Sequence, residues 1–451
     1  MIILWTDALL WLIVMIGGGM AWRMTRRGAV KARWRQVFAS PLAITAFVVL
    51  MGYVFLGLLD SMHFYHQHSP SQPPRVVSVL DTCTGYLGEK MEASYSEPLA
   101  LRAFSESMSM DSKRPSVWAK QPLRYVNPSI ADDHARNKRV RQSLMMAFLG
   151  GLLFCLGLRK WMHNHNRKQV DVSPGVLKTQ LAWWGTLSLM FFTVLTVVLL
   201  AQDFHVLGTD QVGLDVLYKV IKSIRTALII GTLTTLLILP FALFLGCSAG
   251  YFGGWVDDLV QYVYTTISAI PSALLIAAMV LSLHVYMAGH PEGFGSMVEQ
   301  ADTRLLFLCA ILGLTSWTGL CRMLRGETLK LRELEFVQSA RALGSSSWRI
   351  IVRHIFPNVM HLVLIALVLD FSQLILYEAI LSYIGVGVDP STLSWGTLIN
   401  SARMELAREP VVWWPLLSTF VSMLGLVLAM NLFAESVRDA FDPHGHSHSN
   451  D

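Results

Sequence analysis

The chain is 451 residues long, with 53% hydrophobic and only 15% charged residues, and its mean hydropathy is +0.47. Soluble domains carry roughly a quarter of charged residues, so this composition excludes an ordinary soluble protein and predicts a polytopic membrane protein. The net charge of +5 and the pI near 8.9 require no nucleic-acid partner, because basic residues in cytoplasmic loops account for them.

Nine segments are apolar over about the twenty residues that a helix needs to cross a bilayer, or nearly so. They lie near 2–22, 38–59, 143–159, 180–201, 226–247, 263–284, 305–321, 360–384 and 412–434. The predicted fold class is therefore all-α, with nine membrane-spanning helices.

Basic residues predict which loops face the cytoplasm. Six of them follow the first span between Arg23 and Arg35, and seven more lie in the loop 322–358. Positive residues concentrate in cytoplasmic loops, so both segments are expected inside, and the first span is a retained anchor rather than a signal peptide. An odd number of spans then places the N-terminus outside and the C-terminus in the cytoplasm.

Residues 61–142 form the one large polar segment between the spans, and this orientation places them on the extracytoplasmic side. Long translocated segments are exempt from the charge rule, so their basic residues do not argue against that side. The segment contains SPSQPP at 69–74 and shows weak periodicity. It is expected to be a small, loop-rich region that is partly ordered at most.

The segment HVLGTDQVGLDVL at 205–217 precedes the fifth span and holds Asp210 and Asp215. On the outer side, these carboxylates are candidates to meet a charged substrate terminus or a residue of a partner protein. Aspartate also caps turns by accepting hydrogen bonds from nearby backbone amides. Turn capping is at least as well supported by the sequence as the binding role.

Pro271 lies inside the predicted span 263–284. Proline removes one backbone donor and clashes with the preceding turn, so it frees a carbonyl and permits a kink. The sequence allows either a static bend or a hinge at this position.

Residues 335–358 read EFVQSARALGSSSWRIIVRHIFPN, a basic and amphipathic stretch between two apolar segments. Apolar residues recur at three- and four-residue steps, which predicts one helix face that buries itself against a partner. They are Leu331, Leu334, Phe336, Ala340 and Leu343. Gly344 is expected to stop the helix in the left-handed conformation, and Pro357 to break the chain before the next span. The alternative is a surface helix that lies on the lipid headgroups.

Polar residues interrupt the span 360–384 at Asp370, Gln373, Tyr377 and Glu378. Ionisable groups at membrane depth are expensive, so these side chains must face protein or water rather than lipid. One hypothesis places Asp370, Gln373 and Glu378 along a translocation path. The other assigns them to interhelical hydrogen bonds that fix packing.

Motifs for catalysis and metal binding are weak in this sequence. It contains no CxxC, no HExxH and no phosphate-binding GxxxxGK[ST], so any ATP hydrolysis must come from another chain. Histidines cluster at 63/66/68, 163/165 and 444/446/448, and imidazoles at such spacing can bind nickel, zinc or copper. They lack a recognisable cysteine or carboxylate pattern, so a solvated polar segment is the better interpretation.

Several segments together resemble the permeases of ABC importers of the dipeptide, oligopeptide and nickel family. HVLGTDQVGLDVL (205–217) resembles HPLGTDxxGRDVL, and LSYIGVGVDPSTLSWGTLI (381–399) resembles LSFLGLGVxPPxPSWG. The segments AGYFGGWVD (249–257), AIPSALL (269–275), NLFAESVRDAFDP (431–443) and WRQVFASPLAITAFVVL (34–50) match further family segments. The stretch at 335–358 is similar to the cytoplasmic coupling loop of that family, which docks into a groove of the ATP-hydrolysing subunit.

The resemblance implies a six-span permease core with about three accessory helices. The expected parts are an anchor and basic loop (1–36), a first family-like span (37–60), the insert (61–142), two accessory spans (143–204), the permease domain (205–443, with the coupling loop 322–358) and a polar tail (444–451). Two family residues are replaced: Gln338 occupies the position of the motif glutamate, and Leu214 that of an arginine. Glu335, one turn earlier, is a candidate to replace the missing carboxylate.

The resemblance also assigns roles to particular residues. The ATPase-coupling candidates are Glu335, Gln338, Ala340, Gly344 and Pro357, and the extracytoplasmic signature comprises Gly208, Thr209, Asp210 and Asp215. The implied partners are a second homologous permease in a heterodimer, two ATPase subunits and an extracytoplasmic substrate-binding protein. No catalytic residue, metal or cofactor is implied in this chain.

The expected function is that of a permease subunit in the bacterial inner membrane that imports di- or oligopeptides. An importer of nickel or another small solute is the alternative within the family. A secondary transporter with Asp370 and Glu378 as ion sites is the rival from another class, but the coupling loop and the lack of inverted repeats disfavour it. A regulatory or assembly subunit that lost transport remains a further possibility because of Gln338 and the large insert.

Overall fold

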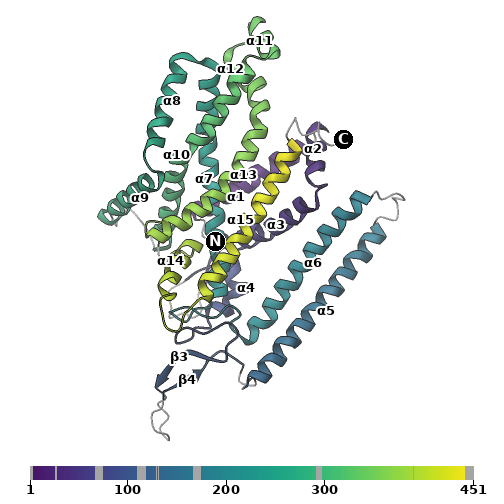
Figure 1. Ribbon diagram of the computed structural model, residues 1–451, viewed down its shortest axis with the longest axis vertical. Helices are drawn as coiled ribbons and strands as arrows, with labels where there is room; N and C mark the ends of the chain where they lie inside the picture. Colours follow the sequence, from purple (N-terminus) through teal and green to yellow (C-terminus); the bar gives the residue numbers. More distant parts are fainter. Residues whose placement is uncertain are drawn as a thin grey trace. The chain divides into compact units, whose positions relative to one another are not determined.

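The computed structural model describes residues 4–25, 28–66, 75–108, 118–127, 130, 132–165, 174–290, 297–389 and 391–441. The elements are α1 (Trp5–Thr25), α2 (Gly28–Val37), α3 (Pro41–Asp60), β1 (His63–His66), β2 (Arg75–Ser78), α4 (Val79–Gly88), β3 (Arg102–Met108), β4 (Trp118–Pro122), α5 (Asp133–His165), α6 (Pro174–Asp203), α7 (Val216–Phe252), α8 (Gly254–Ala269), α9 (Ser272–Gly289), α10 (Met297–Arg332), α11 (Glu335–Ala342), α12 (Ser347–Ile350), the π-helical turn η2 (Ile351–Ile355), α13 (Phe356–Ile384), α14 (Trp395–Glu405) and α15 (Trp414–Phe441). The predicted helical class is confirmed (Figure 1).

Eight helical segments within the described residues are long and apolar enough to cross a membrane. They are Pro41–Asp60, Asp133–Gly157, Lys178–Asp203, Val216–Phe252, Ser272–Gly289, Met297–Arg332, Ser347–Ile384 and Trp414–Phe441. The ninth expected span, 2–22, is not among them, because the apolar part of α1 covers only Trp5–Gly19. The count of nine therefore exceeds what length and composition support.

The chain divides into two compact units. The first comprises Phe38–Thr226 and Leu393–Ala429, and the second comprises Ile3–Val37, Ala227–Thr392 and the segment from Met430 onward. The unit boundaries cut through α7 and α15, so each of these helices contributes to both units.

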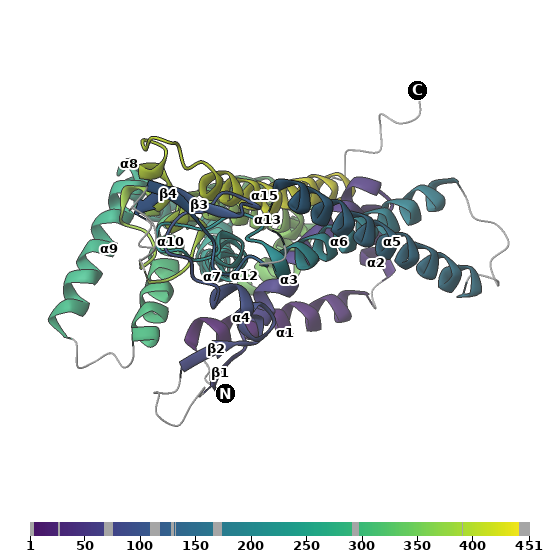
Figure 2. The ribbon, with the colours of Figure 1, turned by 90° about the horizontal axis from the view of Figure 1, so that it is seen from below.

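Within the first unit, α5 and α6 form a long antiparallel hairpin that also packs on α3 (Figures 1 and 2). Their close approach depends on small residues: a Cβ at Gly150 would lie 2.7 Å from a methyl of Leu195. Phe154 stacks on Phe191 with ring centroids 4.5 Å apart. The two predicted accessory spans are therefore one packed pair.

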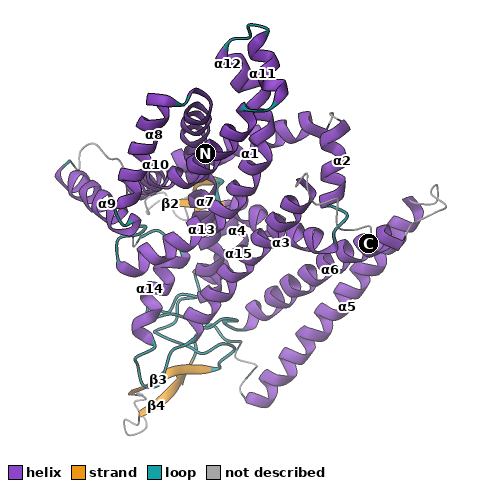
Figure 3. Cartoon of the chain, turned by 45° about the horizontal axis from the view of Figure 1, so that its top comes forward, coloured by secondary structure: helices purple, strands orange, loops and turns teal. Residues whose placement is uncertain are grey.

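The insert between α3 and α5 is more ordered than the sequence led us to expect. It contains two antiparallel hairpins, β1–β2 and β3–β4, with α4 between them (Figure 3). Ser78 and Asp81 form a reciprocal capping box at the start of α4. This S-x-x-D pattern is readable in the sequence, but weak overall periodicity concealed it. The described part of the insert therefore contains regular elements that its sequence did not reveal, joined by loops.

A charged network ties the insert to the neighbouring helices. Lys222 on α7 lies 2.8 Å from a carboxylate oxygen of Asp81 and 3.7 Å from one of Asp60. Tyr218 donates its hydroxyl to Asp81 over 2.8 Å, and Ser78 donates to Asp60 over 2.6 Å. Since each of these groups has a partner, the network joins α3, α4 and the first turns of α7 without leaving a buried charge unpaired.

Within the second unit, the predicted span 263–284 is two helices rather than one. The α8 helix ends at Ala269, Ile270 is extended, and Pro271 caps the N-terminus of α9, where its carbonyl accepts the amides of Leu274 and Leu275. Proline cannot donate to a preceding turn, so it begins a helix more readily than it continues one. Pro271 is therefore a helix break, not a kink.

Two glycines allow α7 and α10 to pack closely in the second unit. Gly246 and Gly250 lie four residues apart and face α10. A Cβ at Gly246 would lie 2.8 Å from the carbonyl oxygen of Cys321, and one at Gly250 would lie 2.7 Å from that of Arg325. Small residues four positions apart let two helix backbones approach closely in membranes. The sequence analysis did not single out this GCSAG motif, although its spacing is visible.

We predict that Gly250→Ala destabilises the protein by about 1–3 kcal/mol, because the added methyl must displace backbone atoms of α10. Gly326→Ala is the matched control, since a Cβ there meets no atom within 4 Å. Thermal unfolding of the two variants in the same detergent measures the difference. Equal stability of the two variants would contradict the proposed close packing.

Candidate functional site

A helical hairpin made of α11 and α12 joins the ends of α10 and α13 and projects beyond them (Figure 1). The α10 helix runs without a break for 36 residues and ends at Arg332, and two residues separate it from α11. This hairpin occupies the position of the predicted coupling loop. Because α10 is continuous, a displacement of α11 reaches deep into the membrane-spanning part of the unit.

Gly344 ends α11 as predicted from the sequence. It has φ +75°, and its amide donates to the carbonyl of Arg341, while the amide of Ser345 donates to that of Ala340. These two bonds satisfy carbonyls that the end of a helix would otherwise leave unpaired. The left-handed conformation suits glycine because other residues adopt it only at a cost of about 1–2 kcal/mol.

The α11 helix buries one side and leaves large apolar side chains on its other side. Val337 and Ala340 are buried against the chain, with exposed fractions of 1% and 9%. Leu343 is 86% exposed and Trp348, at the start of α12, is 59% exposed. The predicted apolar face is therefore only partly covered by this chain. Exposed apolar groups of this size are typical of a surface that contacts another protein or the membrane boundary.

Gln338 has a structural role that a glutamate at this position could not fill. Its side-chain amide donates to the carbonyl of Glu333 over 3.1 Å, within the turn that joins α10 to α11. An ionised carboxylate has no proton to donate to a carbonyl. Glu335 is exposed in the first turn of α11, where a negative charge interacts favourably with the helix dipole.

Pro357 does not break the chain, contrary to the prediction. Residues Ser347–Ile384 form one continuous helical segment, and Pro357 lies in the first turn of α13. The π turn Ile351–Ile355 comes directly before it, and the amide of Phe356 donates to the carbonyl of Ile351. The wider π turn accommodates the residue that lacks an amide proton, so the helix continues.

An ion pair fixes the C-terminal part of α10 to the start of α8. Arg325 makes a bidentate contact with Asp257, in which its Nη2 lies 2.7 Å from Oδ2. The hydrogen bond from Arg325 holds the pKa of Asp257 below its usual range. Arg332, the last residue of α10, donates to the carbonyl of Tyr251 over 3.5 Å. The helix that leads into the hairpin is thus held to the GGWVD turn after α7.

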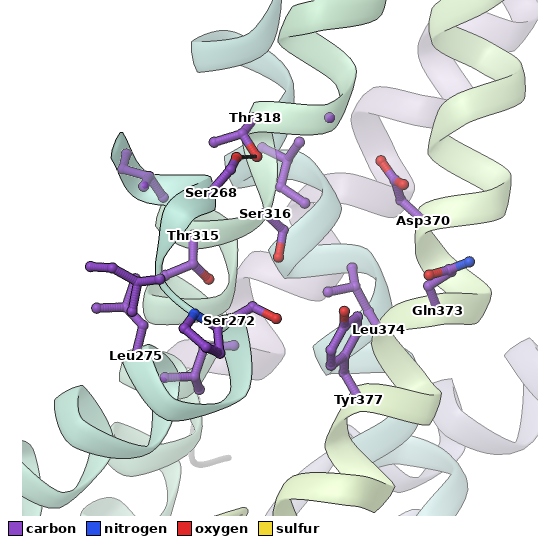
Figure 4. A pocket seen from close by; sticks show the side chains of 16 residues that line it. Ser268, Ser272, Leu275, Thr315, Ser316, Thr318, Asp370, Gln373, Leu374 and Tyr377 are labelled. Atoms are coloured by element: carbon purple, nitrogen blue, oxygen red, sulfur yellow. Dashed lines mark hydrogen bonds between the residues drawn. The ribbon is translucent and has the colours of Figure 1, made fainter. Parts of the chain in front are cut away.

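A polar pocket with a volume of about 380 Å³ lies beside the break between α8 and α9. Asp370, Gln373 and Tyr377 line it from α13. Five hydroxyl side chains line it from the other helices: Ser268, Ser272, Thr315, Ser316 and Thr318. Figure 4 shows the carboxylate of Asp370 on one side of the pocket and the side chains of α10 on the other.

Glu378 does not line this pocket. It is 2% exposed and accepts a hydrogen bond from Ser382, one turn later on α13, over 2.8 Å. The three residues predicted for the path are therefore separated: Asp370 and Gln373 share a pocket, and Glu378 packs within the helix bundle of its unit. Helical spacing alone could not distinguish them, because adjacent positions on a helix point in different directions.

The extracytoplasmic signature lies beneath the insert in the first unit. Gly208 has φ +73°, and a Cβ there would lie 2.4 Å from the carbonyl oxygen of Ser96. Thr209 is fully buried; its amide donates to the carbonyl of Ser96 and its hydroxyl donates to that of Ser94. The amide of Glu92 donates to the carbonyl of Gly213. The insert therefore covers the signature turn through its backbone.

Asp210 and Asp215 both cap the turn. Asp210 accepts the amides of Val212 and Leu214 and pairs with Lys219. Asp215 is 0% exposed and accepts the amide of Leu217 over 2.8 Å. The proposed contact of Asp215 with a substrate or a partner protein was wrong in this conformation, because no partner reaches a side chain that the chain itself encloses.

His205 joins the signature turn to the insert through two buried carboxylates. Its Nδ1 lies 2.8 Å from Asp215 Oδ2, and its Nε2 lies 3.5 Å from Glu92 Oε1. Burial acts to lower the pKa of His205, but the hydrogen bonds to Asp215 and Glu92 outweigh it and raise the pKa above 6.5. Burial acts to raise the pKa of Glu92, but His205 and the amides of Arg124 and Tyr125 lower it. The sequence analysis did not find this cluster, because Glu92 lies far from His205 in the chain.

Residues 242–444 match the model of the family "binding-protein-dependent transport system inner membrane component". The oligopeptide transport system permease protein of Mycobacterium tuberculosis is 34% identical over 243 residues, which are 54% of this chain and 77% of that protein. The chain belongs to this family. The nickel transport system permease protein of Escherichia coli is 32% identical over 241 residues, 53% of this chain and 79% of that protein. The dipeptide transport system permease protein of Lactococcus lactis is 31% identical over 242 residues, 54% of this chain but only 64% of its own length.

One of these relatives is named for nickel transport, so groups of side chains that could bind a metal are of interest. Within the part of the chain that the structure describes, no three residues among histidine, cysteine, aspartate and glutamate are grouped as metal ligands. His68, His444, His446 and His448 lie outside the described residues, as do the side chains of His66, His163 and His165.

The His205 cluster predicts a pH window for stability. The pKa of His205 is raised in the folded state. Its contribution to stability is therefore complete below the ordinary pKa of 6.5 and is lost as the pH rises through the pKa of the folded state. The lowered pKa of Glu92 contributes stability above 4.5 that is lost as the pH falls through its folded value. We therefore expect the melting temperature in detergent to fall as the pH rises above about 6.5.

His205→Gln should remove this alkaline decline, because glutamine carries no titrating proton. His134→Gln, at an exposed histidine, is the matched control and should retain it. An identical decline in wild type and His205→Gln would show that the cluster does not control stability.

Proposed function

We propose that this chain is the permease subunit of an ATP-driven ABC importer in a bacterial inner membrane, and that it translocates di- or oligopeptides. The observation that carries this proposal is the projecting hairpin of α11 and α12. Its apolar side chains are exposed, and it is joined to α10, a helix that lines the polar pocket. Such an arrangement suits an ATPase that pushes on the hairpin from outside the membrane.

The proposal includes partners that this chain does not contain. A second homologous permease would complete the enclosure of the path, and two ATPase subunits would dock on the two hairpins. A substrate-binding protein would deliver the substrate from the extracytoplasmic side. In this chain, the coupling residues would be Glu335, Gln338, Ala340 and Gly344, within a permease domain of residues 205–443.

The proposed orientation places the Trp5 end of α1 outside and the end of α15 in the cytoplasm. Two contacts show how far the segment from α1 to α2 extends within the second unit. The amide of Thr6 donates to Asp302, near the outer end of α10, over 3.3 Å. Trp34 packs edge-on against Phe441, at the cytoplasmic end of α15, with ring centroids 5.9 Å apart. The segment from α1 to α2 thus extends from one end of the unit to the other. This argues that α1 crosses the membrane despite its short apolar part.

Two other functions are less well supported. A nickel importer has a relative in the family, but the pocket offers carboxylate, amide and hydroxyl groups rather than the imidazoles that suit nickel. A secondary transporter that uses Asp370 and Glu378 as one ion site requires them to be near each other. Glu378 lies outside the pocket that Asp370 lines, and such a transporter leaves the coupling hairpin unexplained.

The test is uptake by proteoliposomes that contain the whole importer, with the binding protein supplied outside and ATP enclosed. We expect accumulation of labelled trialanine that requires hydrolysable ATP. Nickel uptake without peptide uptake would favour the alternative within the family. Peptide uptake driven by a proton or sodium gradient without ATP would contradict the proposal as a whole.

Gly344 provides a pair of variants for the same assay. Gly344→Val should insert normally but lose most of its ATP-driven uptake, because a β-branched residue is strained at φ +75° and α11 loses its stop. Gly344→Asn should retain most uptake, since asparagine tolerates the left-handed conformation. Nothing lies within 4 Å of a Cβ at this position, so the side chain itself causes no clash. Equal uptake by the two variants would contradict the role of this stop.

A further inference from the structure

Asp370 is an intramembrane carboxylate without a partner among the described residues. It lies in the middle of α13 and makes no hydrogen bond or ion pair with them. Other acidic groups of the same unit are satisfied: Asp257 pairs with Arg325, Asp302 accepts from Thr6, and Glu378 accepts from Ser382. An unpaired acid at membrane depth is costly and therefore marks a site where something else binds.

We propose that Asp370 binds one positively charged group of the transported molecule, an ammonium or a guanidinium, inside the pocket. This inference rests on the proposed function as a permease and names the chemical class of its cargo. A peptide carries such a group at its N-terminus and on basic side chains. Asp370 would then select for cargo whose positive charge enters the pocket.

The charge of the pocket is determined by Asp370. Among the sixteen residues that line it, Asp370 is the only aspartate or glutamate, and none is lysine, arginine or histidine. The C-terminal end of α8 and the N-terminal end of α9 both reach the pocket, and their partial charges are opposite in sign. Their effects offset each other, so an ionised Asp370 leaves the pocket negative.

The remaining lining groups suit an ammonium ion. An ammonium has three donors and no acceptor, so it needs a carboxylate and further oxygen acceptors around it. Ser316, Thr318 and Tyr377 supply hydroxyl oxygens, and Gln373 supplies an amide oxygen. The volume of about 380 Å³ lies in the range of small-ligand sites, which suits one residue of a peptide better than a bare ion.

The test measures the charge preference of the pocket directly, in the full importer. Ser316→Cys places a thiol in the pocket, in a background where the exposed Cys83 and Cys155 are replaced by serine. The thiol is treated with the methanethiosulfonate reagents that carry an ethylammonium or an ethylsulfonate group. With Asp370 present, we expect the cationic reagent to react about tenfold faster or more than the anionic reagent, because one charge acts at short range. Each rate is first divided by the rate of the same reagent with a free thiol in solution.

Adding Asp370→Asn should abolish this preference, whereas adding Glu378→Gln should leave it intact. Glu378→Gln is the matched control because it removes a carboxylate of the same helix that does not line the pocket. An unchanged preference in Asp370→Asn would overturn the inference. Failure of both reagents to reach the thiol would overturn it as well, because cargo would then be excluded too.

Uptake separates this inference from the proposed function. The measured quantity is the ratio of trialanine uptake to N-acetyl-trialanine uptake, and Asp370→Asn should lower this ratio relative to wild type. The preference of the binding protein is the same in both proteins, so it cancels in this comparison. A charge preference without any peptide uptake would refute the proposed peptide transport and leave the cation site standing. Peptide uptake whose ratio is unaffected by Asp370→Asn would refute the cargo role of Asp370.

Discussion

The close packing of α7 on α10 is the constraint on which the function of the second unit depends. Gly246 and Gly250 bring the two backbones together where any larger side chain would force them apart. The pair Asp257–Arg325 ties the same helix to α8. As a result, the C-terminal half of α10 is held against both α7 and α8.

This arrangement places the hairpin and the pocket on one rigid element. Ser316 and Thr318 line the pocket from α10, and α10 ends at Arg332, where the hairpin begins. Sixteen residues of α-helix between Ser316 and Arg332 span about 24 Å. A displacement at the hairpin is therefore transmitted to the pocket by continuous backbone hydrogen bonds, without a separate signalling pathway.

The break between α8 and α9 follows from the same membrane physics. In hydrocarbon every backbone polar group needs a partner, so non-helical backbone is tolerated only where it is buried or lines a polar cavity. Ile270 and Pro271 line the hydroxyl-rich pocket, which meets this condition. The π turn before Pro357 solves a related problem, because it continues a helix across a residue without an amide proton.

Local features of the fold were predictable from the sequence, whereas features set by distant contacts were not. The stop at Gly344 was predictable because only a local backbone conformation is involved. The effects of Pro271 and Pro357 were not, because surrounding packing decides whether a proline breaks, begins or continues a helix. The burial of the signature turn beneath the insert depends on residues more than a hundred positions away, because Thr209 bonds to Ser94 and His205 contacts Glu92. Helical spacing grouped Asp370, Gln373 and Glu378, but only Asp370 and Gln373 line the same pocket.

The most direct test of the proposed coupling is disulfide crosslinking between Leu343→Cys, directly after α11, and a cysteine in the groove of the ATPase subunit. Leu343 is 86% exposed, so a thiol there is accessible. Tyr86→Cys, in the insert that is predicted to be extracytoplasmic, is the control. We expect a crosslink from Leu343→Cys whose yield changes when the ATPase is trapped with nucleotide, and none from Tyr86→Cys. No crosslink from Leu343→Cys, or a yield that is the same with and without nucleotide, would contradict the proposed coupling.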